Sequence, residues 1–133
     1  MAANIERWWA AALIAATPAL PAHADSVACH VTYVGETRVI GAGATTRPLA
    51  VAPVSIGSYF MFRIVFRQEP ADLAAIKVYA YADRDEGPAI IHQATWPWPP
   101  PPAAAHGFTG LHFVYEPVRD GELQYWCEMK DAP

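Results

Sequence analysis

Two strand-like runs near the C-terminal end of the sequence constrain the fold more than any other feature. Residues 108–116 and 122–129 are rich in aromatic and β-branched side chains, and the turn residues Pro117, Asp120 and Gly121 lie between them. This pattern predicts an antiparallel β-hairpin. Because both faces of the first run are largely apolar, we expect it to be a central strand that is covered on both sides.

The part of the chain before this hairpin repeats the strand pattern. Five further strands are expected, at residues 26–34, 37–40, 56–66, 76–82 and 89–96. The longest of them alternates regularly, and its apolar face is the expected centre of the core, namely Phe60, Phe62, Ile64 and Phe66. Seven strands separated by turns, with almost no helix, predict an all-β antiparallel sandwich.

A short motif in the last strand makes this expectation more specific. Tyr125 stands two residues before Cys127, just after the turn at Asp120 and Gly121. The arrangement resembles the tyrosine corner of immunoglobulin domains. The resemblance covers fewer than ten residues and implies an immunoglobulin-like architecture, without membership of a family.

Residues 1–24 have the three-part form of a secretory signal peptide. Arg7 precedes an apolar run at residues 8–16, and small residues then provide a cleavage site after Ala24. We therefore expect one β-sandwich domain, residues 25–133, in the periplasm or secreted from the cell. An uncleaved N-terminal anchor is the alternative. No later segment reaches the roughly 18 apolar residues of a spanning helix, so no transmembrane segment is expected after cleavage.

The two cysteines, Cys29 and Cys127, lie near opposite ends of the expected mature chain. In an exported protein two cysteines most simply form one disulfide, here between the first and last strands. Such a bond closes a loop of about 100 residues and stabilises by roughly 4 kcal/mol on the loop-entropy model. There are two alternatives: the cysteines form a thiolate pair for metal or redox chemistry, or Cys29 is a site of lipid attachment.

The charge of the chain is mildly acidic, with a formal net charge of −4. The acidic residues are dispersed and no lysine or arginine cluster is visible in the sequence. Nucleic acid and anionic membrane surfaces are therefore not expected as partners. An envelope protein or a small ligand, neither of them identified by the sequence, remains as the expected partner.

Histidines provide a candidate metal site. If the strands that contain His92 and His112 pair symmetrically about the loop between them, the two imidazoles face each other. His106 in that loop is a candidate third ligand, and Met129 a candidate soft ligand. Such a set suits copper or zinc. Our expectation is that His112 is a buried, hydrogen-bonded residue and that no cofactor binds, and the copper or zinc site is the alternative.

The segment 96–102 provides a candidate binding surface, because its prolines hold two indoles. Rigid indoles lose little entropy when they bind a sugar face, an aromatic group or a partner surface. The predicted ligand-binding residues are Trp96, Trp98, Pro99 and Phe108. The alternative is structural, with the indoles covering the core and the prolines protecting a sheet edge.

Signals for catalysis are weak. The serines after residue 24 lie outside any nucleophile motif, and nothing places Glu116 and Glu122 in a cleft. We therefore predict a small exported, non-catalytic binding or accessory protein that presents the Trp/Pro-rich loop. A periplasmic copper or zinc protein and a structural subunit of an envelope complex are the two alternatives.

Overall fold

The computed structural model describes residues 25–101 and 105–131. The expected signal peptide, residues 1–24, and Pro102 of the predicted loop lie outside them. The strands are β1 (Asp25–Tyr33), β2 (Glu36–Gly43), β3 (Val54–Ile56), β4 (Phe60–Arg67), β5 (Ala75–Arg84), β6 (Gly87–Pro97), β7 (His112–Glu116) and β8 (Gly121–Asp131). Two short 3-10 turns, η1 (Pro48–Ala50) and η2 (Ala71–Leu73), interrupt the strand pattern.

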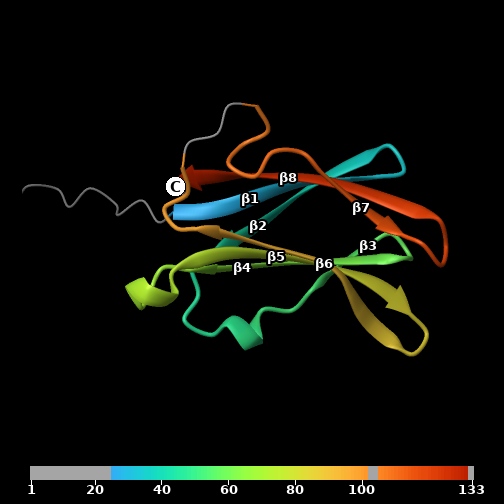
Figure 1. Ribbon diagram of the computed structural model, residues 1–133, viewed down its shortest axis with the longest axis horizontal. Coiled ribbons are helices and arrows are strands. Elements are labelled where there is room, and N and C mark those ends of the chain that lie inside the picture. Colours follow the sequence, from blue (N-terminus) through green and yellow to red (C-terminus); the bar gives the residue numbers. More distant parts are fainter. Residues whose placement is uncertain (1–24, 102–104, 132–133) are drawn as a thin grey trace, which may run out of the picture.

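The strands form two antiparallel sheets of four, which appear as separate layers in Figure 1. One sheet has the order β2-β1-β8-β7 and the other the order β3-β4-β5-β6. The predicted all-β antiparallel sandwich is thereby confirmed. Where the structure is described, it contains no helix long and apolar enough to cross a membrane.

A disulfide joins Cys29 on β1 to Cys127 on β8, as predicted for the first and last strands. The two residues are directly opposite each other in the register of the sheet, and 98 positions separate them in the sequence. The bond therefore lies within one sheet, whereas the disulfide of an antibody domain crosses between its two sheets. It closes almost the whole described chain into one loop.

The core lies between the sheets and is centred on β4, as the alternation predicted. Phe60, Phe62, Ile64 and Phe66 are all buried, with at most 3% of their surface exposed. They pack against the inward residues of β1 and β8, which include Val27, Val31, Leu123 and Tyr125. Each fully buried side chain of this size contributes about 1.5–3 kcal/mol of transfer free energy.

The expected strand 56–66 is two strands, β3 and β4, joined by a tight turn. Gly57 in this turn has a φ of +59°, and an added Cβ would lie 2.5 Å from the Tyr33 ring. Only glycine fits this backbone and this contact. Because the turn reverses the chain, Val54 pairs with Phe62 in a short hairpin instead of extending the same strand.

The expectation that residues 108–116 form a central strand is wrong. Only residues 112–116 are a strand, and β7 pairs with β8 alone, at the edge of its sheet. Its outward residues Phe113 and Tyr115 are 59% and 53% exposed. The run is apolar on both faces, but only its inward residues Val114 and Glu116 are buried, and the outward residues remain exposed in the described structure.

The β7–β8 turn is held by a buried carboxylate. Glu116 is only 1% exposed and accepts hydrogen bonds from the backbone N–H groups of Val118 and Arg119 and from the Arg84 guanidinium. Burial raises the pKa of Glu116, but these donors outweigh it and lower the pKa below the usual value. The Arg84 bond links this turn to β5 of the other sheet.

Candidate functional site

A groove of about 430 Å³ lies at the end of the sandwich where the chain leaves β6 and returns toward β7. Three of the four predicted ligand-binding residues line it: Trp98, Pro99 and Phe108. The remaining lining residues are Asp25, Pro100, Pro101, Gly107, Glu128 and Met129. The Pro-rich segment thus forms one wall, and the paired ends of β1 and β8 contribute another.

The returning segment is fixed against β8 by its backbone. The Phe108 N–H donates to the Cys127 carbonyl at 3.0 Å, and the Cys127 N–H donates to the Thr109 hydroxyl at 2.9 Å. Gly107 has a φ of +62°, and a Cβ at this position would overlap the Cys127 carbonyl oxygen. A glycine is therefore required where the chain approaches the sheet most closely.

The tryptophan of the groove is supported from behind by the core. The Trp98 ring lies 5.9 Å from the ring of Phe66, which is fully buried. Because one side of the indole contacts the core, the core fixes the orientation of the Trp98 ring in the absence of a ligand. This is the arrangement that makes aromatic side chains efficient binding residues.

The groove combines an apolar surface with an acidic rim. Trp98, Phe108 and Met129 supply the apolar surface, while Asp25 and Glu128 supply carboxylates. Glu128 is also hydrogen-bonded to His30 at 2.8 Å across the β1–β8 pair. Among the described residues no lysine or arginine lines the groove. The surface therefore suits a neutral ring that carries hydrogen-bond donors.

Trp96, the fourth predicted ligand-binding residue, lies outside the groove. Its ring packs edge-to-face against Phe108 at 5.8 Å and against His112 at 5.6 Å. It is half-buried and contacts the core, so its position agrees with the structural alternative. Trp96 supports the groove indirectly because it contacts the ring of Phe108.

The two predicted metal-binding histidines lie close together, but the strands that carry them do not pair. β6 pairs with β5, and β7 pairs with β8. His92 and His112 instead approach each other across the open edge between the two sheets, with their ring centroids 5.8 Å apart. The prediction that their two strands pair with each other, with His92 directly opposite His112, is therefore wrong.

Both imidazoles already have hydrogen-bond partners. His92 Nε2 lies 2.6 Å from the Tyr125 hydroxyl, and His112 Nε2 donates to the Thr109 carbonyl at 3.0 Å. The His112 ring also stacks on Tyr125, with the ring planes 11° apart. Burial lowers the pKa of His92, and the charge of His112 lowers it further.

The third candidate ligand lies elsewhere. His106 packs against Trp126, at a ring distance of 5.9 Å, on the outward face of the sheet. Met129 lines the groove described above. Within residues 25–101 and 105–131, no group of three or more histidine, cysteine, aspartate or glutamate side chains could hold a metal ion.

The hydroxyl of Tyr125 also separates this protein from the immunoglobulin tyrosine corner. In that corner the hydroxyl bonds to backbone a few residues upstream. Here it bonds to His92 on the opposite sheet. The resemblance between the two therefore stops at the Tyr-x-Cys spacing.

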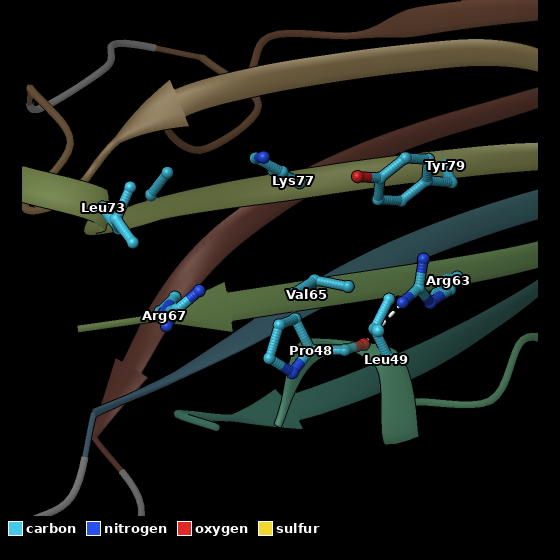
Figure 2. Close-up of a pocket in the computed structure, with 9 residues that line it drawn as sticks. Pro48, Leu49, Arg63, Val65, Arg67, Leu73, Lys77 and Tyr79 are labelled. Carbon is cyan, nitrogen blue, oxygen red and sulfur yellow. Dashed lines mark hydrogen bonds between the residues drawn. The ribbon is translucent and has the colours of Figure 1, made fainter. Parts of the chain in front are cut away.

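The structure also shows a hollow that the sequence analysis missed, on the outward face of the β4–β5 pair (Figure 2). It has a volume of about 260 Å³ and is lined by Pro48, Leu49, Arg63, Val65, Arg67, Leu73, Ala75, Lys77 and Tyr79. Arg63 and Arg67 both lie on β4 and Lys77 lies on β5, so the three basic residues form one group only in the folded sheet. The polar positions that alternate with the core residues of β4 are the one sequence signal that could have pointed to it.

Comparisons of the chain with protein-family models, with curated proteins and with solved structures find no match.

Proposed function

We propose that this protein is an exported, non-catalytic binding protein that holds a neutral sugar ring in the groove between Trp98 and Phe108. The observation that carries the proposal is the composition of this groove. A rigid indole and a phenyl ring lie beside two carboxylates, and among the described residues no basic side chain lines it.

The chemistry of a pyranose ring fits both parts of the groove. Its C–H groups pack on the electron-rich face of an indole, as other positively polarised edges do. Its hydroxyls are donors, and the carboxylate oxygens of Asp25 and Glu128 are acceptors. A ligand with acidic groups would be repelled chiefly by Asp25, because Glu128 is paired with His30 and Lys130.

Export is supported by the cysteine chemistry. A disulfide joins Cys29 and Cys127, and disulfides persist in oxidising compartments. The N-terminal sequence has the form of a secretory signal. Together they favour the periplasm or the exterior, where glycans of the cell envelope are available as ligands.

The test is isothermal titration of the purified protein with neutral trisaccharides, cellotriose and chitotriose. We expect binding of at least one of them, and a loss of about tenfold or more in affinity for Trp98→Ala, because the stacking surface is removed. Phe113→Ala is the matched control, since Phe113 is an exposed aromatic residue that does not line the groove.

The control variant should bind as tightly as the wild type. Equal binding by wild type and Trp98→Ala would contradict the proposal. So would tighter binding of an acidic trisaccharide than of its neutral counterpart.

The metal-binding alternative has one observation in its favour, the 5.8 Å separation of the His92 and His112 rings. It lacks a third ligand among the described residues, and both Nε2 atoms are hydrogen-bonded. We therefore rank it below the binding groove. Titration with copper(II) and zinc separates the two functions, because a sugar-binding groove needs neither ion.

A further inference from the structure

The outward face of the β4–β5 pair gathers three basic side chains. Strand alternation places Arg63 and Arg67 on one face of β4, and Lys77 lies opposite Val65 in the register of the sheet. All three line the hollow of Figure 2. They are three of only nine lysine and arginine residues in a chain whose net charge is −4.

These three cations have no acidic partner in the described part of the chain. The ion pairs found there involve His30, Arg84 and Lys130 only. No aspartate or glutamate is among the residues that line the hollow. Like charges that line one hollow repel each other, and a bound anion would relieve this repulsion.

The two arginines are held in place by backbone carbonyls. Arg63 donates from Nε to Val51 at 2.8 Å and from Nη2 to Pro48, and its guanidinium lies 5.0 Å from the centre of the Tyr79 ring. Arg67 donates from Nε to Glu69 at 2.9 Å. These tethers fix the guanidinium planes and leave terminal N–H groups for a ligand.

The hollow is apolar between its charges. Val65 and Ala75 lie on the sheet, and the two 3-10 turns bring Leu49 and Leu73 to its margins. Leu49 is 95% exposed and Leu73 is 53% exposed, so both leucines present apolar surface to solvent. Figure 2 shows Arg67 and Arg63 toward opposite ends of this apolar strip, with Lys77 along one side.

We propose that this hollow binds a small amphiphilic anion, whose carboxylate or phosphate group contacts Arg67 and Lys77 and whose hydrocarbon part packs on Val65, Leu49 and Leu73. The volume of about 260 Å³ is below the range of pockets for drug-sized ligands, so the ligand is small. This site shares no lining residue with the groove at Trp98. The two can therefore be tested independently.

The experiment is isothermal titration of the full-length protein with hexyl phosphate, hexanoate, inorganic phosphate and the neutral hexyl glucoside. We expect binding of at least one of the two hexyl anions. We expect inorganic phosphate to bind at least about tenfold more weakly than hexyl phosphate, because it cannot use the apolar strip. The neutral glycoside should not compete for the site. The relative affinity of phosphate and carboxylate then identifies the head group.

Two variants remove the charges that the proposal uses. Lys77→Gln and Arg67→Gln should each weaken binding of the hexyl anion by about tenfold or more, since each removes a charge-assisted contact. Leu73→Ala should weaken binding of the hexyl anion but leave that of inorganic phosphate unchanged. Lys130→Gln is the matched control, because Lys130 is a strand lysine that does not line the hollow.

Thermal unfolding of each variant checks that its fold is retained. The proposal is overturned if neither hexyl anion binds, or if Lys77→Gln and Arg67→Gln bind it as tightly as the wild type. It is also overturned if Lys130→Gln weakens binding equally, which would indicate a nonspecific charge effect, or if hexyl glucoside displaces the hexyl anion.

Discussion

At the scale of single residues, the structure places polar groups at the open edge of the sandwich and gives each of them a partner. His92 on β6 bonds to the Tyr125 hydroxyl, and His112 on β7 bonds to a loop carbonyl. Aromatic contacts from Trp96 and Tyr125 surround the two rings. The histidines therefore close the edge where two neighbouring strands belong to different sheets.

The lowered pKa of His92 makes the stability of the protein depend on pH. Burial and the nearby His112 favour neutral His92, so the unfolded chain binds more protons just below pH 6.5. The stability that neutral His92 contributes is fully present above about pH 6.5. It is lost as the pH falls through the lowered pKa of His92 in the folded state. Urea unfolding at pH 7.5, 6 and 5 should show a falling midpoint.

His92→Gln is the control for this pH dependence, because an amide can still bond to the Tyr125 hydroxyl but does not titrate in this range. Its unfolding midpoint should vary less between pH 7.5 and 5 than that of the wild type. The same pH dependence in both proteins would show that His92 is not the titrating group.

At the scale of elements, a few backbone positions decide where strands end and how loops return. Gly57 turns the chain between β3 and β4, and Gly107 allows the segment before β7 to lie against β8. The buried Glu116 carboxylate holds the β7–β8 turn. Gly107 lines the groove, whereas Gly57 and Glu116 fix turns away from it, and the core strands only supply the support.

Gly107→Ala should destabilise the protein by more than the cost of backbone strain alone. Alanine at this position would have an unfavourable positive φ, and its Cβ would also overlap the Cys127 carbonyl oxygen. Gly35→Ala is the matched control, since Gly35 has a φ of +76° but no atom within 4 Å of an added Cβ.

We expect a loss of about 1–2 kcal/mol in the free energy of unfolding for Gly35→Ala and a larger loss for Gly107→Ala, measured in urea. Gly107→Ala should also weaken ligand binding in the groove, because Gly107 lines it. Equal losses for the two variants would show that the close approach at Cys127 is not a constraint.

At the scale of the whole molecule, the disulfide joins the first and last strands and so restrains almost the whole described chain. The bond spans 98 positions, and long loops lose the most entropy when they are closed. The start of β1 and the end of β8 lie side by side near this bond, since Asp25 pairs with Asp131 in the sheet. The groove is built on this pair of ends.

Loss of the disulfide should therefore lower the free energy of unfolding by about 2–4 kcal/mol. The measurement is urea unfolding of the wild type with and without reductant, compared with the double variant Cys29→Ala/Cys127→Ala. The double variant should behave like the reduced wild type and should not respond to reductant. A wild-type midpoint that reductant does not change would contradict the role given to the bond.

The Trp/Pro-rich segment predicted the candidate groove only in part. Trp98, Pro99 and Phe108 could be chosen from the sequence because prolines beside indoles are a local signal. The contributions of Asp25, Glu128 and Met129 come from strand ends that meet only in the folded sheet. The hollow at Arg63, Arg67 and Lys77 was missed for the same reason, since it requires the register between β4 and β5.

The sequence by itself determined the class of fold, the core strand and the disulfide. Alternation of Phe60, Phe62, Ile64 and Phe66 depends only on the two-residue period of a strand, and a chain with two cysteines has only one possible internal pairing. The C-terminal hairpin and the pairing of the first and last strands were expected from the sequence, and the tertiary structure decided how the other strands are arranged. The order of the strands in the sheets explains why β7 lies at an edge, why Phe113 is exposed and why His92 lies close to His112. This order is set by contacts between segments that are distant in the sequence. Local periodicity carries no information about such contacts, because it repeats identically in central and edge strands.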